Sequence, residues 1–303
     1  MSTQLIKSYL TLVRFPNLFT MPSNIFAGYF SVQIQHSIEI STVIPLILIS
    51  VSLYAAGVIL NDVADRKIDL KERPNRPIPS GKITLRNAVF LASLLIVTSI
   101  VASLFISVTT LVVVVFLIVL ILLYDFLLKN SSFSPVAMSG TRVVNVLLGA
   151  STNLTFIAGE TDFMFYRLLL VCASEFTYIS GISILSKYET LYNKLFWLRR
   201  LNIILLVSPL IIGTFGAISG FFNDSTWIYL VIFGSFMSAI LIPFSKSAMT
   251  NFTLQKIISL LVTGVIIHDA VYIGGSLDSW YAGMSTFVLL LPTILLGRKF
   301  YVT

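Results

Sequence analysis

Residues 61–82 read NDVADRKIDLKERPNRPIPSGK and follow directly on an apolar segment of the chain. This stretch holds four acids and six of the twenty Lys and Arg residues. At roughly 100° per residue, its acids fall on one side of a helix: Asp62, Asp65, Asp69 and Glu72. A carboxylate stripe at the end of an apolar helix predicts an ion site at a membrane mouth. The alternative is a charged loop that only orients the protein.

The composition around this stretch is that of an integral membrane protein. Of 303 residues, 56% are hydrophobic and only 11% are charged, and the mean hydropathy is +0.94. A soluble fold of this length would have to expose an apolar surface. The apolar segments are also longer and more continuous than barrel strands, which need only ~10 alternating residues. The sequence therefore predicts an all-α, polytopic membrane bundle of nine to ten transmembrane helices.

The candidate spans follow one another along the whole chain. Ten segments approach the ~20 residues that a helix needs to cross a bilayer, at about 17–34, 42–60, 87–108, 110–128, 135–158, 163–185, 201–222, 227–244, 255–275 and 280–298. Polar caps at 61–86 and 186–200 each follow a helix, and no second soluble domain is evident. We therefore expect one transmembrane domain over residues 1–303.

The distribution of basic residues predicts the orientation in the membrane. Eighteen of the 20 Lys and Arg residues fall on the side that holds both caps and both chain ends. The other two, Arg142 and Arg167, lie within or at the edge of apolar segments. Because cytoplasmic loops carry the excess of Lys and Arg, the caps and termini are expected in the cytoplasm. We expect a multi-pass protein of the plasma (inner) membrane, with its site facing the cytoplasm.

The charges of residues 61–82 also predict a ligand. Carboxylates at i, i+3 and i+7 can share a divalent ion, and magnesium usually bridges a few carboxylates to substrate phosphates. Arg73 and Arg76, with Lys67, Lys71 and Lys82 nearby, can take the remaining phosphate charge. This combination predicts a magnesium-dependent diphosphate site at the cytoplasmic edge of the membrane.

With these residues in view, the sequence resembles a known family. Asn61-Asp62-x-x-Asp65-x-x-x-Asp69, followed by Arg73-Pro74-x-Arg76-Pro77-Ile78-Pro79-Ser80-Gly81, is similar to the first signature of the UbiA superfamily of intramembrane prenyltransferases. Further matches are Arg14-Phe15-Pro16-Asn17, Asn24-x-x-x-Gly28, and Tyr124-Asp125 with Lys129. Together with the helix pattern, the resemblance covers nearly the whole chain.

The resemblance implies a fold and an activity. The implied fold is a helical bundle around a central cavity that opens to the cytoplasm at the caps and sideways to the lipid bilayer. The implied activity is transfer of an isoprenyl group from a diphosphate donor to a hydrophobic or aromatic acceptor. Mg²⁺ is the implied cofactor, and we expect no nucleic acid among the partners. Diphosphate departs, and the acceptor captures the allylic cation.

The resemblance also implies roles for residues by their position. Four residues would hold magnesium, and the three aspartates among them would be catalytic: Asn61, Asp62, Asp65 and Asp69. Three basic residues would bind diphosphate: Arg73, Arg76 and Lys129. Arg14 would contribute to the same binding. The ring of Tyr124 would stabilise the allylic cation, an attraction that strengthens away from water.

The sequence departs from the family at its second motif. Family members carry a second Asp-rich motif after the sixth helix, but residues 178–190 contain no aspartate and only one acid, Glu189. A second magnesium ion would depend on Glu189 and on hydroxyls such as Ser186. This variant, with Arg142-x-x-Asn145-x-x-x-Gly149 in the fifth helix, is most similar to the EboC-like branch. That branch is associated with moving or processing a metabolite precursor.

Other polar groups inside the predicted spans leave alternatives open. A charge near the bilayer centre costs at least ~2.5 kcal/mol on insertion scales, so it usually faces a cavity or a partner. Glu175 could pair with Arg142, or Arg142 and Asn145 could line the cavity and bind substrate. His268 and Asp269 could form a proton relay or satisfy each other between helices.

These polar groups also allow competing functions. A catalytically reduced protein could keep the fold and transport or scaffold a metabolite precursor, with Glu175, Arg142 and His268-Asp269 along its path. A protein that binds diphosphate without chemistry would need only the first motif. The intact Arg-Pro-x-Arg-Pro sequence after that motif favours the enzyme.

Overall fold

The computed structural model describes residues 3–33, 39–154, 162–187, 196–246, 251–277 and 279–297. Throughout these ranges the regular elements are helices, which confirms the all-α prediction. In chain order they are α1 (Thr3–Leu12), η1 (Phe15–Phe19), α2 (Thr20–Ser31), α3 (Ile40–Ala64), α4 (Arg66–Glu72), α5 (Leu85–Leu104), α6 (Val108–Leu123), η2 (Tyr124–Leu128), α7 (Ser134–Ala150), α9 (Asp162–Lys187), α10 (Phe196–Ile218), α11 (Thr226–Lys246), α12 (Asn251–Ser276), α13 (Trp280–Thr286), η3 (Phe287–Leu289) and α14 (Leu290–Gly297).

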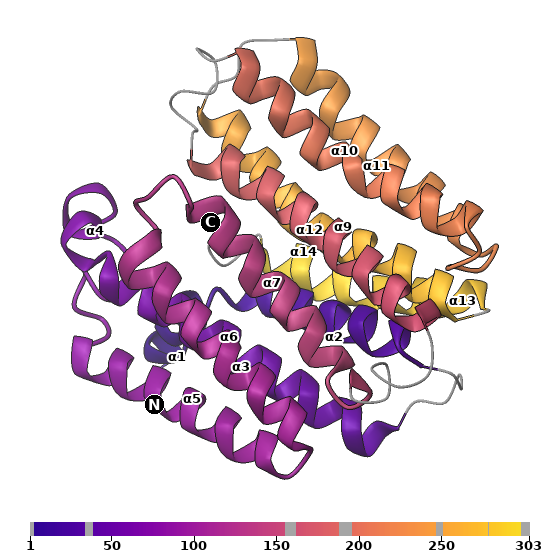
Figure 1. Ribbon diagram of the computed structural model, residues 1–303. Helices are drawn as coiled ribbons and strands as arrows, with labels where there is room; N and C mark the ends of the chain where they lie inside the picture. Colours follow the sequence, from indigo (N-terminus) through magenta and orange to yellow (C-terminus); the bar gives the residue numbers. More distant parts are fainter. Residues whose placement is uncertain are drawn as a thin grey trace.

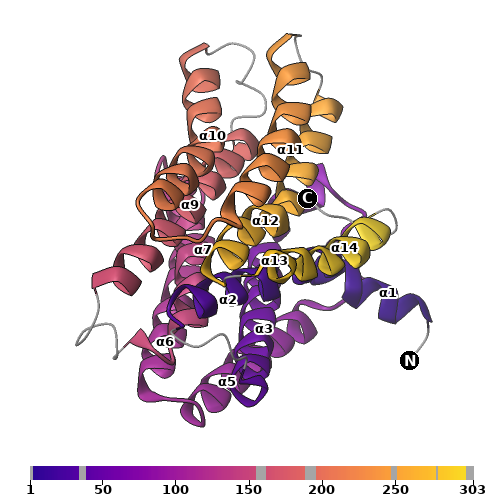
Figure 2. The same cartoon turned by 90° about the vertical axis from the view of Figure 1, so that its right-hand side faces the viewer.

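The long helices form a bundle with an apolar exterior. Seven helices of the described part are long and apolar enough to cross a membrane. Large apolar side chains point outward along them, such as Phe90 on α5, Phe116 on α6 and Ile211 on α10. Apolar surface of this extent is stable only against lipid. The chain is therefore a multi-pass integral membrane protein, with α5 and α6 at one edge and α10 and α11 at the opposite edge (Figures 1 and 2).

Three predicted spans differ from the observed helices. The span predicted at 17–34 is α2, whose 12 residues extend only about 18 Å. Pro16 lies in the 3₁₀ turn η1 before it, because proline fits the first turn of a helix but not its interior. The span predicted at 135–158 ends with α7 at Ala150. The span predicted at 280–298 is divided into α13, η3 and α14.

The short helix α2 lies inside the bundle and positions its neighbours. It packs on α3, α7, α9 and α12, and 10 of its 12 residues are buried. Figures 1 and 2 both place it beside α7. At Gly28 an added Cβ would lie 1.9 Å from the Val146 oxygen, and at Gly149 it would lie 2.2 Å from the Ile25 oxygen. The two glycines therefore let the backbones of α2 and α7 touch, as small residues do between membrane helices.

Candidate active site

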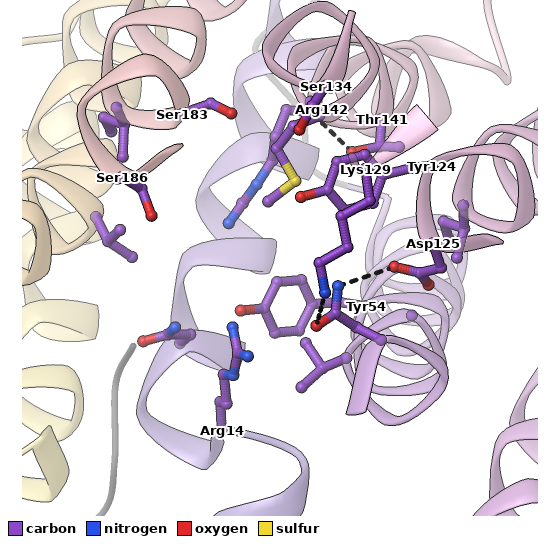
Figure 3. Close-up of a pocket in the computed structure, with 18 of the residues that line it drawn as sticks. Arg14, Tyr54, Tyr124, Asp125, Lys129, Ser134, Thr141, Arg142, Ser183 and Ser186 are labelled. Atoms are coloured by element: carbon purple, nitrogen blue, oxygen red, sulfur yellow. Dashed lines mark hydrogen bonds between the residues drawn. The ribbon is translucent and has the colours of Figure 1, made fainter. Parts of the chain in front are cut away.

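A pocket of about 640 Å³ lies between the first and second halves of the bundle. Its walls come from η1, α2, α3, α4, α6, η2, α7, α9 and α12. Figure 3 shows Arg14, Tyr54, Lys129 and Arg142 around it. The outer end carries three of the four acids and two of the six bases of the 61–82 stretch, and the inner wall includes apolar residues such as Leu117 and Val262.

The predicted acidic stripe continues across a break between two helices. Helix α3 ends at Ala64 and α4 begins at Arg66. Backbone hydrogen bonds still run from Asp65 N to Asn61 O at 3.0 Å and from Asp69 N to Asp65 O at 2.9 Å, so the helical spacing persists. Asn61, Asp65, Asp69 and Glu72 line the pocket. Asp62 is 5% exposed and lies behind this wall.

Basic side chains neutralise these carboxylates. Arg76 Nη1 lies 2.7 Å from Asp69 Oδ2 and 3.2 Å from Asp62 Oδ1. Arg14 Nη2 lies 3.7 Å from the same Asp62 oxygen. The Lys129 ammonium pairs with Asp65. Acids and bases thus alternate at the outer end, and each could exchange its present partner for a metal ion or a phosphate.

The donor set fits a divalent cation that prefers oxygen. Asp62 and Asp69 each direct an oxygen at the same Arg76 nitrogen, so these two oxygens already converge on one point. Asn61 Oδ1, 3.0 Å from Lys129 Nζ, adds an amide oxygen beside Asp65. Magnesium takes hard oxygen ligands of this kind and keeps several waters.

Arg14 holds a left-handed backbone conformation beside the pocket. Its φ of 48° makes it the one non-glycine residue of the described part with positive φ. Such a conformation costs about 1–3 kcal/mol and persists where the surroundings determine it. Here it lies between α1 and the η1 turn, and the side chain reaches Asp62.

A π turn brings a further group of residues into the pocket wall. In η2, Lys129 N donates to Tyr124 O at 2.9 Å, and this i→i+5 bond places Lys129 over Tyr124 and Asp125. All three line the pocket. Single π turns inside α-helices are frequent at functional sites.

Asp125 is a site residue to which the sequence analysis gave no role. It is 6% exposed, and its Oδ1 accepts a hydrogen bond from Asn61 Nδ2 at 3.1 Å. Its Oδ2 is buried without a hydrogen-bond partner in the described part, so the oxygen is available to a cation or to a ligand donor. An ionisable residue inside an apolar span was the signal that could have identified it.

The remaining predicted residues lie at the mouth and at the second cap. Arg73 is exposed at the mouth, and Ser186 lines the wall opposite the acids. Ser183 and Lys187 line the same wall, and the Lys187 ammonium donates to Ser131 O. Glu189 and most of the predicted cap at 186–200 lie outside the described residues.

Arg142 and Asn145 line the inner part of the pocket. Arg142 does not pair with Glu175 directly, so the alternative in which the two pair is wrong. Its Nη1 donates to Asn24 Oδ1 at 3.1 Å, and Asn24 Nδ2 donates to Glu175 Oε1 at 3.2 Å. Asn24 therefore lies between the two charges. His268 contacts both Asp269 and Glu175.

A polytopic bundle with alternating acids and bases at the outer end of an internal pocket suits a membrane protein whose ligands are an anion and a cation. Residues 22–242 match the family model described as the UbiA prenyltransferase family. This match covers most of the chain, so the chain belongs to the UbiA prenyltransferase family, as its signature residues predict. The likeness to the EboC-like branch stays a prediction.

Individual relatives support this assignment. The digeranylgeranylglyceryl phosphate synthase of Methanocaldococcus jannaschii is 34% identical over 170 residues, which are 55% of this chain and 57% of that protein. The chain spans about half the length of the curated relatives it matches.

Solved structures share the fold. An apo UbiA homologue from Aeropyrum pernix K1 matches with a TM-score of 0.70 at 14% identity, over 86% of this chain and 98% of that one. A UbiA homologue from Archaeoglobus fulgidus bound to GPP and Mg²⁺ matches with a TM-score of 0.57 at 12% identity, over 88% of this chain and 99% of that one.

Proposed function

We propose that this protein transfers an isoprenyl group from an isoprenyl diphosphate to a hydrophobic or aromatic acceptor, with Mg²⁺ as cofactor. The observation that carries the proposal is the alternation of carboxylates and cations at one end of a single pocket: Asp62, Asp65 and Asp69 against Arg14, Arg76 and Lys129. A diphosphate brings negative charge that only a metal ion and basic side chains can neutralise. The A. fulgidus homologue bound to GPP and Mg²⁺ supports the same ligand class here.

The acids are proposed to hold magnesium and the bases to hold diphosphate. Asn61, Asp62, Asp65 and Asp69 would be the metal ligands, and Asp125 lies beside them. When bound, magnesium neutralises charge that develops on the leaving diphosphate. Arg14, Arg73, Arg76 and Lys129 bind the phosphate oxygens and orient the donor.

The chemical step separates charge within the pocket. The bond between the allylic carbon and the diphosphate oxygen breaks, and both electrons leave with the oxygen. The allylic cation that remains lies near the Tyr124 ring, whose face attracts a cation away from water. A nucleophilic atom of the acceptor then forms the new bond and releases its proton. Apolar walls exclude water that would otherwise capture the cation.

The second cap is proposed to complete the site with fewer acids than the family pattern has. Ser183, Ser186 and Lys187 face the pocket from α9, and Glu189 would add its one carboxylate. Lys187 supplies a positive charge where the family has a second acid cluster. This arrangement favours direct binding of phosphate oxygens at the second cap over a second magnesium ion.

The membrane setting follows from the same proposal. The whole chain, 1–303, acts as one transmembrane domain, with the pocket opening to the cytoplasmic side of the plasma membrane. A transport path through Glu175, His268 and Asp269 is disfavoured. These residues are at most 1% exposed, and they are not among the described residues that line the pocket.

The test is calorimetric titration of the detergent-purified protein with geranylgeranyl diphosphate, with and without Mg²⁺. We expect binding that requires Mg²⁺ and is lost in the Asp62→Ala/Asp65→Ala variant. Asp224→Ala, an exposed acid outside the pocket, is the matched control and should bind as the wild type does. Absence of diphosphate binding in both metal conditions would overturn the proposal and leave scaffolding as the leading function.

A further inference from the structure

A second cluster of charged groups lies inside the bundle, away from the diphosphate end. Glu175 on α9 and His268 and Asp269 on α12 are 0–1% exposed. His268 Nδ1 lies 3.1 Å from Asp269 Oδ1 and 3.2 Å from Glu175 Oε2. His268 Nε2 lies 2.8 Å from the Ser174 hydroxyl, and the Tyr178 ring stacks on the imidazole at 5.1 Å. These contacts hold the His268 imidazole beside both carboxylates.

The two carboxylates determine how the Asn24 amide is oriented. Asn24 Nδ2 donates to Asp269 Oδ2 at 2.9 Å and to Glu175 Oε1 at 3.2 Å. Both amide hydrogens therefore point at acceptors, and the amide oxygen must point the other way. That oxygen accepts from Arg142 Nη1 at 3.1 Å. If the Asn24 amide were flipped, its hydrogens would point at the Arg142 guanidinium, and its oxygen would face the two carboxylate oxygens without a hydrogen between them.

Arg142 itself carries a charge without a carboxylate partner. None of the ion pairs in the described part includes it. Besides Asn24, its donors meet the Thr20 hydroxyl at 3.3 Å and its Cζ lies 5.4 Å from the Tyr54 ring centre. It is only 6% exposed, yet it lines the pocket. A buried guanidinium is always charged and normally pairs with an anion, so this one is prepared for an anion that enters the pocket.

Arg142 lies too deep to serve the diphosphate end. It is eight residues beyond Ser134 on α7, and Tyr54, under the guanidinium, is seven residues before Asn61 on α3. At 1.5 Å per residue both offsets amount to about 10–12 Å along the helices. The tip is held against α2 by Thr20 and Asn24.

Several neighbours of Arg142 in the pocket are polar, although the Met21 sulfur also lies 3.8 Å from Arg142 Nη1. Ser50 donates to Asn145 Oδ1 at 2.6 Å, and Tyr54 and Thr141 line the same region. A hydrocarbon chain against these groups would leave a charge and several dipoles unpaired, which is costly in a dry site. An oxyanion suits them, because hydroxyl and guanidinium groups can all donate to it.

We propose that the Arg142 guanidinium is a second anion site that binds a carboxylate or phosphate of the acceptor, and that Glu175, His268 and Asp269 position it through Asn24. This inference rests on the proposed function only in taking the bound molecule to be the acceptor. The site binds an oxyanion whether or not the diphosphate end performs the transfer. It restricts the acceptor to molecules with one acidic group about 10 Å from the diphosphate.

The test measures affinity for two pairs of probes that differ by one charge. The pairs are 4-hydroxybenzoate with 4-hydroxybenzyl alcohol, and geranylgeranylglyceryl phosphate with geranylgeranylglycerol. Each is titrated into the full-length protein in detergent, with and without Mg²⁺ and a non-cleavable geranylgeranyl thiodiphosphate. The wild type is expected to prefer the charged member of one pair. The pair that responds identifies a carboxylate or a phosphate as the natural group.

Variants at two arginines separate this site from general effects of burying a charge. Arg142→Gln is expected to lower affinity for the charged probe about 30-fold or more, to leave the uncharged probe unchanged, and to keep donor binding. Arg142→Lys should retain part of the preference. Arg167→Gln is the matched control, since Arg167 is also buried in a span, 8% exposed, with its guanidinium over the Phe163 ring. Equal affinity for both members of both pairs, or equal effects of the two Gln variants, would overturn the proposal.

The positioning role has its own readout. Asn24→Leu keeps Arg142 but removes the amide that orients it, and Glu175→Gln/Asp269→Asn removes the two negative charges that orient that amide. Both are expected to reduce the preference for the charged probe about tenfold while donor affinity stays within about twofold. A purely structural role would lower the melting temperature and weaken both members of a pair equally, and that result would refute the positioning role. Loss of donor binding in the wild type would refute the transferase but not this site.

Discussion

Replacing Arg76 by Met is expected to destabilise the protein in a way that Mg²⁺ reverses. Arg76 Nη1 contacts Asp69 at 2.7 Å and Asp62 at 3.2 Å, and the three side chains are 11%, 5% and 7% exposed respectively. The variant therefore leaves two nearly buried carboxylates without their main partner. Removing one partner of a buried pair costs about 3–5 kcal/mol.

The destabilisation of Arg76→Met is expected at the lower end of that range, about 3 kcal/mol. Arg14, at 3.7 Å, still faces Asp62, and Asp69 borders the open pocket. A loss of about 3 kcal/mol lowers the melting temperature by roughly 6 °C or more, at about 2 °C per kcal/mol for a large domain. Magnesium at about 100 times its dissociation constant would return about 2.7 kcal/mol, so most of the loss should disappear.

The assay is thermal unfolding in detergent, followed by tryptophan fluorescence, in EDTA and in excess Mg²⁺. The magnesium response should be larger in Arg76→Met than in the wild type, because the guanidinium no longer competes for the carboxylates. Arg167→Met is the control, because it removes a buried cation far from these acids. It should lower the melting temperature without enlarging the response to Mg²⁺. If Mg²⁺ raises both variants by the same amount, the acids do not hold the metal and the reasoning fails.

Further predictions concern packing, charge and the cation. Gly28→Ala should lower stability by about 1–3 kcal/mol through overpacking, because its Cβ would lie 1.9 Å from a backbone oxygen of α7. At Gly140 the nearest atom would be 3.9 Å away, so Gly140→Ala should be tolerated in the same melting assay. Lys129→Met should weaken donor binding about tenfold or more in calorimetry. Lys82→Met should not, because Lys82 is an exposed residue of the cap; equal losses in both variants would show that only the net charge of the protein matters. Tyr124→Phe should keep most of the single-turnover rate and Tyr124→Leu should lose about tenfold; a Phe variant as slow as Leu would refute cation stabilisation by the ring.

The outer end of the pocket was predictable because its residues are neighbours in the sequence. Asn61, Asp65 and Asp69 recur at helical spacing, so one helix direction brings them to one wall even though α3 and α4 break at Asp65. Lys129 was found through its motif, although the π turn that aims it was not. A π turn depends on local packing rather than on a residue pattern.

Sequence analysis offered Arg142 and Asn145 as cavity residues, and both line the pocket, but the contacts behind Arg142 were not predictable because their residues come from four helices. Asn24, Arg142, Glu175 and Asp269 lie in four separate apolar segments, and periodicity alone cannot say which helices face each other. The direct pairing of Glu175 with Arg142 was the simplest solution by charge. The structure instead links them through the Asn24 amide, because α2 packs on both α7 and α9.

The burial of α2 has a consequence for how the protein is made. Asn24 completes its hydrogen bonds only with Arg142, Glu175 and Asp269, which follow it by 118, 151 and 245 residues. At a synthesis rate of about 5–20 residues per second, Asp269 emerges roughly 10–50 s after Asn24. During that interval α2 has about 18 Å of helix, too little to cross the ~30 Å hydrocarbon core. Helix α2 is therefore among the last elements to complete its contacts, and we expect it to stay at the membrane surface or in the insertion machinery until Asp269 has been synthesised.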